Sequence, residues 1–483
     1  MTDIAAPTRK TLSQIGREPS ATTHWARLPW ALAVLAICLT FTISDLVQPT
    51  SGAIGLDGNW VVISQPQCAT EAVSCDPASP TIQWGDRLLS IGGLTHSDYV
   101  SDLSPAVAPF TRFEPGDVVP VTLMRDGNLI ETDWTVPART AVKTIGRFTF
   151  IALIYAPFWA AGTWILLRLD QTDRRWYLFL FFVYGMSIWL ASGAISDQRV
   201  AYSSLVLHLI TWPLMVTVVH LHLEFPVRLL PLRLHRLLLS GFYAAAVGFI
   251  FLELTGPLPI DWAIYWATLA ILITLVLLAY HVLRSQSAGI RLTARMMFIG
   301  WFLAFAPSII WTAIANSPLT TNNPFVSQMS TATALIAIPL LPFFYTYALF
   351  KQRLGAQEPR FRRWMGHYLL FWFYMGVFHG ALVVGAVWRA DADILLVLAM
   401  LVTAALLMAS VTLHGVLQRW LYRFTHGFIY EPDRLLHLFA RRIPANADRD
   451  LLRSLLVERL APALRINQSA LYLLPGHGRV RLL

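Results

Sequence analysis

A short run of ionisable residues closes one of the long apolar segments of this chain. His220, His222 and Glu224 stand directly before Phe225 and Pro226. Imidazole and carboxylate groups can transfer protons or bind a transition metal. On a helix, His220 and Glu224 share one face while His222 points elsewhere, so a third metal ligand would have to come from another helix. Since the chain has no His-Glu-x-x-His motif, the usual zinc-protease site is excluded, and we expect these residues to have a structural role without a metal.

Other ionisable residues within the apolar segments are few, and each is a functional candidate because a charge there is costly. His208 and His379 lie deepest and could act as proton-sensitive switches, although a histidine hydrogen-bonded between helices is the more common case. Asp45 and Glu253 lie near segment ends, where we expect them to reach water. No catalytic constellation and no cofactor-binding motif occurs in the sequence, so the sequence alone predicts neither an enzyme nor a bound cofactor.

The segments that position these residues are typical of an integral membrane protein. Of 483 residues, 56% are hydrophobic and 13% are charged, whereas about a quarter of the residues in soluble domains are charged. The formal net charge of +9 comes from basic residues spread over short loops, which argues against a nucleic-acid partner. Stretches of about 20 apolar residues can cross a bilayer as helices. We predict ten such helices, at 28–47, 147–168, 176–196, 202–224, 236–256, 261–283, 293–315, 328–350, 366–388 and 392–416.

The distribution of basic residues predicts the orientation of these helices. After the second predicted helix, alternate loops carry clusters of arginine and lysine, while the loops between them hold only Arg199 and Arg389. Because cytoplasmic loops carry the excess of basic residues, we expect the N-terminal tail 1–27 and the C-terminal tail after residue 416 to be cytoplasmic. Residues 48–146 would then lie outside. We therefore expect a multi-pass protein of the bacterial inner (plasma) membrane.

The segment 48–146 carries strand and turn signals that the rest of the chain lacks. Residues 60–64 read as a strand, 85–93 as a turn, a short strand and a second turn, and 97–108 as a helix. Asp126-Gly127 between two apolar runs, 117–123 and 129–136, predicts a tight hairpin. Cys68 and Cys75 could form a disulfide if the compartment is oxidising, and free thiols are the alternative. We expect a small α+β domain here.

This pattern resembles a PDZ domain. The residues that match the glycine–aspartate segment of that family are Gly85, Asp86, Leu88, Ile91 and Gly92. The resemblance implies that an extended peptide binds by adding a strand to the sheet. The candidate groove would comprise Gly55, Leu56, Trp60, Val61 and Val62. The carboxylate-binding loop of the family has only a loose counterpart at 55–58, and the alternative is a partner-docking module without a peptide ligand.

The cytoplasmic tail resembles a second family. The linker 417–447 is similar to that of bacterial sensor histidine kinases, and 448–483 is similar to the first part of a GAF domain. The matching linker residues are Leu417, Gln418, Arg419, Arg423, Tyr430, Pro432 and Leu435. With the PDZ-like domain 48–146 and the bundle 147–416, the architecture resembles the sensor region of peptide-pheromone-sensing kinases of the competence type. No phospho-accepting histidine with ATP-binding segments follows in the sequence, so no residue of this chain is matched to a catalytic residue of the kinase family.

These resemblances imply a membrane receptor. We expect a homodimer in membrane lipid that senses an extracytoplasmic ligand, such as a peptide, and passes the signal to a cytoplasmic output domain. That output domain would be absent from this chain, so we expect either a truncated gene or fragment or an arrangement in which the remaining domains lie elsewhere. The alternative is a membrane scaffold that docks partner proteins through residues 48–146 and has no catalytic output.

Overall fold

The structure is a computed structural model that describes most of the first 353 residues. The described residues are 27–48, 55–56, 60–64, 82–83, 85–136, 141–168, 175–256, 258, 260–285, 287–315, 337–353, 472–473 and 481–482. The chain divides into two compact units, residues 1–403 and 404–483. In the second unit, the described strands β7 (Tyr472–Leu473) and β8 (Arg481–Leu482) form an antiparallel pair. The remaining description concerns the first unit.

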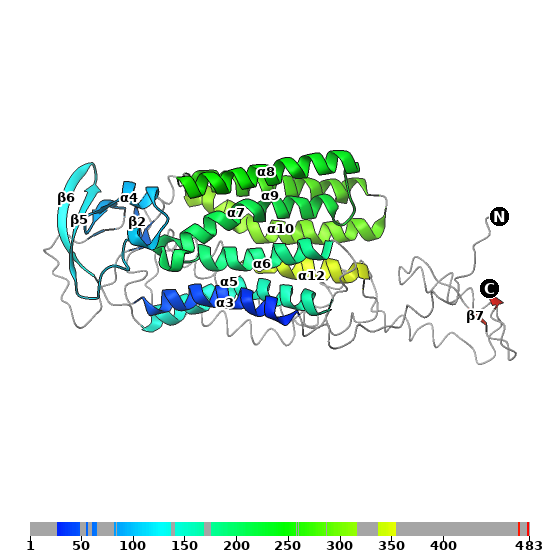
Figure 1. The fold of residues 1–483 in the computed structure, drawn as a ribbon, viewed down its shortest axis with the longest axis horizontal. Coiled ribbons are helices and arrows are strands. Elements are labelled where there is room, and N and C mark those ends of the chain that lie inside the picture. The colour runs from blue at the N-terminus through cyan, green and yellow to red at the C-terminus, as the bar shows by residue number, and fades with distance from the viewer. Residues whose placement is uncertain are drawn as a thin grey trace. The chain divides into compact units, whose positions relative to one another are not determined.

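Long apolar helices dominate the first unit and lie side by side (Figure 1). Within the described ranges they are α3 (Leu28–Val47), α5 (Ala141–Arg168), α6 (Arg175–Gly193), α7 (Ser203–Glu224), α8 (Leu232–Thr255), α9 (Ile260–Arg284), α10 (Ala288–Ala315) and α12 (Leu340–Arg353). Six of these are long and apolar enough to cross a membrane, while the apolar parts of α6 and α12 are shorter. The chain is therefore a multi-pass helical membrane protein.

The predicted helix positions agree with some of the described helices more closely than with others, and α12 begins only at Leu340, after a turn at 337–339 inside the predicted segment 328–350. The predicted segments 28–47 and 202–224 correspond to α3 and α7 to within one residue. Helix α8 begins four residues before its predicted segment, because the apolar residues Leu232 and Leu234 extend the run beyond Arg233 and Arg236. The predicted segments 366–388 and 392–416, and the first part of 328–350, lie outside the described residues.

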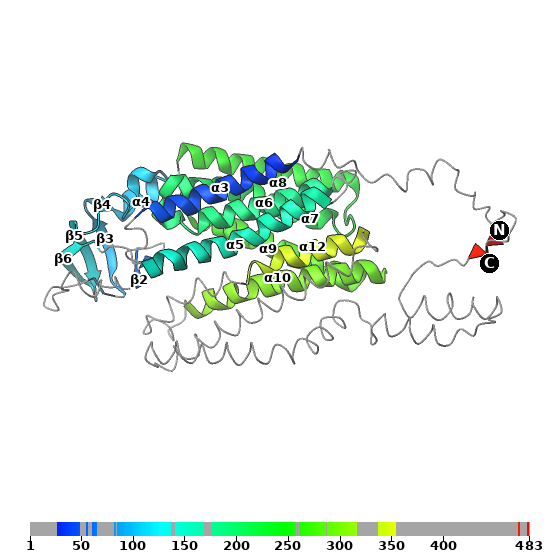
Figure 2. The same cartoon turned by 90° about the horizontal axis from the view of Figure 1, so that it is seen from below.

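Helix α7 lies at the centre of this bundle. It packs against α6, α8 and α9, while α3 packs against α5 and α6, and α12 packs against α10 and α5 (Figure 2). The most apolar stretch of α7 is 61% buried, compared with 17% for α8 and 22% for α9. A helix that is apolar on every side is buried by its neighbours. Helix α8 instead exposes a row of large apolar side chains, which would face lipid.

A small β-rich module, residues 55–136, precedes α5. Its main sheet has the strand order β4-β3-β5-β6, and every neighbouring pair is antiparallel. The strands are β3 (Arg87–Ile91), β4 (Leu94–Thr95), β5 (Val118–Arg125) and β6 (Asn128–Thr135), beside a separate pair of β1 (Gly55–Leu56) and β2 (Val62–Ser64). The predicted hairpin is confirmed. Asp126 and Gly127 join β5 to β6 with φ of 51° and 81°, the left-handed values that a type I′ turn requires.

The predicted helix over 97–108 is wrong in extent. Helix α4 (His96–Ser101) ends after six residues, and a single 3₁₀ turn, η1 (Pro105–Val107), follows. The Asp102 carboxylate accepts the Ser104 backbone N–H at 2.8 Å and competes with helical hydrogen bonding. Ser104 also precedes Pro105, and the residue before proline avoids the helical region. The segment therefore breaks at 102–104.

The module has its own apolar core and one buried ion pair. Trp60, Leu88 and Ile91 are among its buried core residues. The Asp86 carboxylate, 1% exposed, accepts from Nε and Nη2 of Arg125 at 2.7 Å each. The same carboxylate accepts the Gln83 backbone N–H at 2.6 Å. Asp86 thus joins the start of β3 to the end of β5, and its hydrogen bond is the main reason that the pKa of Arg125 is raised.

Replacing Asp86 by alanine should loosen the β5–β6 hairpin. The change removes the carboxylate that accepts from the Gln83 backbone N–H and from the Arg125 guanidinium, a loss of about 1.5–3 kcal/mol. In the intact chain, hydrogen exchange of residues 118–135 should accelerate roughly 10- to 100-fold, measured by mass spectrometry. Asp133→Ala, an exposed acidic residue on β6, is the matched control. Equal exchange in the two variants would contradict the structural role of the ion pair.

Candidate functional site

The module contacts the helical bundle through one arginine. Arg199 lies in the turn between α6 and α7, and its Nη2 donates to the backbone carbonyl of Tyr99 on α4. The guanidinium carbon lies 3.9 Å from the centroid of the Tyr99 ring, a cation–π contact. In return, the Tyr99 hydroxyl donates to the backbone carbonyl of Asp197 at 3.2 Å. Tyr99 and Arg199 therefore join the module and the bundle by three polar contacts.

The turn that carries Arg199 has an unusual backbone. Arg199, Ala201 and Tyr202 have φ of 55°, 51° and 58°. Residues with a Cβ rarely adopt these left-handed values, and each costs about 1–3 kcal/mol unless its surroundings hold it. Strain of this kind is concentrated at binding sites and switches.

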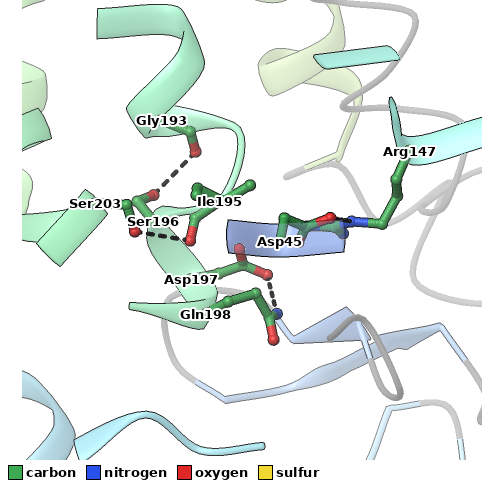
Figure 3. A network of polar contacts seen from close by, with 8 residues as sticks. All are labelled: Asp45, Arg147, Gly193, Ile195, Ser196, Asp197, Gln198 and Ser203. Carbon is green, nitrogen blue, oxygen red and sulfur yellow. Dashed lines mark hydrogen bonds and ion pairs between the residues drawn. The ribbon is translucent and has the colours of Figure 1, made fainter. Parts of the chain in front are cut away.

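Hydrogen bonds within the turn hold this backbone in place (Figure 3). The Ser196 hydroxyl donates to the Gly193 carbonyl at 3.0 Å, and the Ser203 hydroxyl donates to the Ile195 carbonyl at 3.1 Å. The Gln198 amide donates to the Asp197 carboxylate at 2.6 Å. Because Ser203 is the first residue of α7, the turn and the start of α7 are connected directly.

An ion pair joins α3 to α5 beside this turn. Arg147 donates from Nε and Nη2 to the two carboxylate oxygens of Asp45 at 3.1 and 2.9 Å (Figure 3). The Asp45 side chain is fully buried. The expectation that Asp45 reaches water is therefore wrong, because the carboxylate is enclosed between two helices and satisfied by Arg147. The pair holds together the two helices that flank the module in the sequence.

A cavity of about 210 Å³ lies between the module and the bundle. The module contributes mainly apolar and aromatic side chains, which are Leu56, Trp60, Tyr99, Val100, Leu103, Pro109 and Phe110. The bundle contributes the polar side, which includes Asp197, Arg199 and His208. An apolar cavity with a few converging polar groups is the usual form of a small-molecule site.

Arg199 supplies the charge of this cavity. The residue is 3% exposed, and its Nε and Nη1 have no hydrogen-bond partner among the described residues. Burial lowers the pKa of the Arg199 guanidinium, and the contact with Tyr99 partly offsets this effect. Burial likewise raises the pKa of the Tyr99 phenol. Arginine remains charged in proteins, so a buried and only partly satisfied cation stands in the wall of the cavity.

A second buried pair lies beside the cavity. The His208 Nδ1 atom on α7 is 2.6 Å from a carboxylate oxygen of Glu253 on α8, and both side chains are almost fully buried. The common case anticipated for His208, a hydrogen bond between helices, is confirmed. The expectation that Glu253 reaches water is wrong, because α7 and α8 enclose it. Its second oxygen has no hydrogen-bond partner within the described part of the chain.

The histidines near the other end of α7 have two different environments. His222 is fully buried, and its Nε2 is hydrogen-bonded to the Tyr345 hydroxyl, which also accepts from Nε1 of Trp301. His222 therefore connects α7 to α10 and α12. His220 and Glu224 face α8 instead, where His235 approaches them. The prediction that His222 points away from the other two residues is confirmed.

The residues of the PDZ-like motif stabilise the fold of the module. Leu88 and Ile91 are fully buried, and Asp86 holds Arg125. Gly92 has φ of 55°, and a Cβ there would lie 2.5 Å from the Phe113 ring. No other residue type fits this position without a shift of Phe113.

The candidate groove residues are divided among several environments. Gly55 and Leu56 form strand β1, Val62 is fully buried in the core, and Val61 bridges to Arg87. Leu56 and Trp60 line the cavity beside Arg199. Of the remaining candidates, Cys68, Cys75 and His379 lie outside the described residues.

The sequence analysis did not identify Arg199 and Tyr99 as a pair. The sequence does set Arg199 apart, because it is one of only two basic residues in the predicted outer loops that follow the second predicted helix. A lone arginine in such a loop indicates a specific partner. Tyr99 carried no comparable signal, because it is one of 15 tyrosines and its contact with Arg199 joins residues that are 100 positions apart.

The His208–Glu253 pair should behave as a coupled unit in a double-mutant cycle. His208→Leu leaves a buried carboxylate without its partner and should cost about 3–5 kcal/mol of unfolding free energy. The double change His208→Leu/Glu253→Leu should cost less than the sum of the single changes. Unfolding in mixed detergent micelles measures each value. Leu254→Ala, on the exposed side of α8, is the control, and strict additivity of the two changes would contradict the coupling.

In comparisons with known proteins, no family model, no curated protein and no solved structure matches this chain.

Proposed function

We propose that this chain is the membrane-sensor region of a signalling receptor and that its ligand binds in the cavity between the module and the bundle. The observation that carries this proposal is Arg199. A buried guanidinium, two of whose nitrogens have no partner among the described residues, lines a cavity with one apolar and one polar side. Unpaired buried donors are costly, and a ligand that accepts from them would remove that cost. The strained turn that holds Arg199 supports the same proposal.

The chemistry of the cavity favours a ligand with one carboxylate and an apolar body. A carboxylate accepts a strong, charge-assisted hydrogen bond from a guanidinium nitrogen, and neither Nε nor Nη1 of Arg199 has a partner among the described residues. Trp60, Leu103 and Phe110 would cover the apolar part of the ligand. The free C-terminus of an apolar peptide has this composition. We therefore propose an extracytoplasmic peptide as the ligand.

Helix α7 would carry the signal through the membrane. It begins at Ser203, whose hydroxyl holds the turn of Arg199, and its 22 residues span about 33 Å. The helix is the most buried of the described spans, so a shift at its start would change its packing against α6, α8 and α9. A ligand can transmit a signal only if it favours one of two packing arrangements of these helices.

The wider architecture is part of the same proposal. We propose ten membrane helices, a PDZ-like fold for the outer module, cytoplasmic termini and an inner-membrane location, on the basis of the hydropathy and arginine patterns. The resemblance of residues 417–447 to sensor-kinase linkers supports a homodimer that controls a histidine kinase. The kinase domain would belong to the complete receptor and would supply its catalytic activity.

Short apolar peptides should bind to the full chain in lipid nanodiscs through their C-terminal carboxylate. We expect the free-acid peptides to bind and the amidated forms of the same sequences to bind about 10- to 100-fold more weakly, since charged hydrogen bonds contribute about 1.5–3 kcal/mol each. Calorimetry measures both affinities. Arg199→Gln should weaken the binding of the free-acid peptides to the affinity of the amidated ones.

Arg112→Gln is the matched control, because Arg112 lies in the module but does not line the cavity. It should bind both peptide forms like the unchanged chain. Peptide binding that does not depend on Arg199 would place the ligand elsewhere. The absence of binding by any free-acid peptide would favour the scaffold function, in which the module docks proteins.

The proposed output can be tested separately. Residues 1–447 fused to the catalytic core of a histidine kinase should autophosphorylate at a rate that changes when a binding peptide is added. Arg199→Gln should abolish the response to the peptide. A fusion that binds peptide but never changes its rate would contradict the sensor function while leaving the ligand site intact.

A further inference from the structure

We propose that the ends of α7 and α8 remote from the module form a zinc site. Its ligands would be Nε2 of His220, a carboxylate oxygen of Glu224 and Nε2 of His235. One ligand atom from each residue lies within 4.8 Å of the other two. Two histidines and one carboxylate are a donor set typical of Zn²⁺. His235 is the third ligand from another helix that the spacing of His220 and Glu224 requires.

One of the distances between the ligand atoms matches a tetrahedral site. Zinc–ligand distances of about 2.0–2.1 Å place two tetrahedral ligands about 3.3 Å apart. His235 Nε2 lies 3.2 Å from a Glu224 oxygen, which matches this separation. His220 Nε2 lies 4.0 Å from the same oxygen, so His220 would have to move closer when the metal binds.

The Tyr243 hydroxyl orients the ring of His220 for metal binding. It lies within hydrogen-bond distance of Nδ1 of His220, 3.1 Å away. Nε2 is therefore the nitrogen of His220 that is available to a metal, and it lies 4.0 Å from a Glu224 oxygen. Metal-binding histidines are usually oriented by a hydrogen bond of this kind at the other ring nitrogen.

A zinc ion at this site would displace an arginine. Glu224 is the only acidic residue among the three ligands, and Arg228 donates to the same oxygen at 3.0 Å. Arg228 is 46% exposed, so it can turn into solvent when a metal takes its place. His235 is 4% exposed, and its Nδ1 has no hydrogen-bond partner among the residues described. Glu224 alone therefore provides a hydrogen-bond partner for the buried His235 ring, and a metal would hold the ring more firmly.

A zinc ion here would fasten two helices together. Residues 225–231 form the connection between α7 and α8, and the metal would bridge the helices on either side of it. Three protein ligands leave a fourth position open for water or another ligand. This inference rests on residues at the opposite end of α7 from Arg199, so it is independent of the proposed peptide site.

Zinc binding can be measured on the full chain in detergent, purified with a tag that contains no histidine. Competition with a chromophoric chelator should give one Zn²⁺ per chain. His235→Ala should lower the affinity more than 100-fold, because loss of an outer partner alone costs about 10- to 100-fold. His281→Ala is the matched control, since His281 is a buried histidine on α9 that is not among the three ligands. It should leave the affinity unchanged.

A second variant separates metal binding from a folding defect. Tyr243→Phe keeps the ring and removes the hydroxyl that orients His220, so we expect an affinity about 10- to 100-fold lower with normal elution in size-exclusion chromatography. Substituted Co²⁺ should show the visible absorption of a four-coordinate site, and His235→Ala should abolish it. Zinc binding that survives both His235→Ala and Glu224→Gln, or no stoichiometric binding to the unchanged chain, would overturn the proposal.

Discussion

A polar side chain inside a bilayer has no water to bind, so it must find a partner on another helix. Several buried polar residues of this bundle obey that constraint in pairs. Asp45 with Arg147 joins α3 to α5, and His208 with Glu253 joins α7 to α8. His222 with Tyr345 joins α7 to α12. Because apolar helices pack against one another with little specificity in lipid, these pairs select which helices become neighbours.

The same constraint distinguishes Arg199 from the other buried charged residues. Its Nη2 is satisfied by the Tyr99 carbonyl, while Nε and Nη1 are buried without partners in the described part of the chain. Asp45 and Glu253 are each paired with a basic side chain, whereas Arg199 lines a cavity. We therefore regard the paired charges as structural and the charge of Arg199 as available to a ligand. Helix α7 starts beside this arginine and ends at His220 and Glu224, so the two proposed sites lie at opposite ends of one helix.

Local features of the fold could be predicted well from the sequence. The bounds of α3 and α7 follow from apolar runs of membrane length, and the hairpin follows from Asp126-Gly127, which tolerates positive φ. The break after α4 was missed although its cause is local, because the competition of Asp102 and Pro105 with a short helix depends on small energies. The burial of Asp45 and Glu253 was also missed, since neither residue's own neighbours in sequence reveal its partner.

The sequence by itself determined that the chain crosses a membrane several times and carries one small β-rich module. Both conclusions depend on properties of contiguous residues. The membrane helices follow from the hydropathy of about 20 successive residues, and the hairpin of the module follows from the two residues of its turn. Only the tertiary structure decided that Arg199 meets Tyr99 and that His235 joins His220 and Glu224. Those contacts depend on which helices pack together and in which rotation. Packing of that kind arises from all the interhelical contacts at once, and no short stretch of sequence contains it.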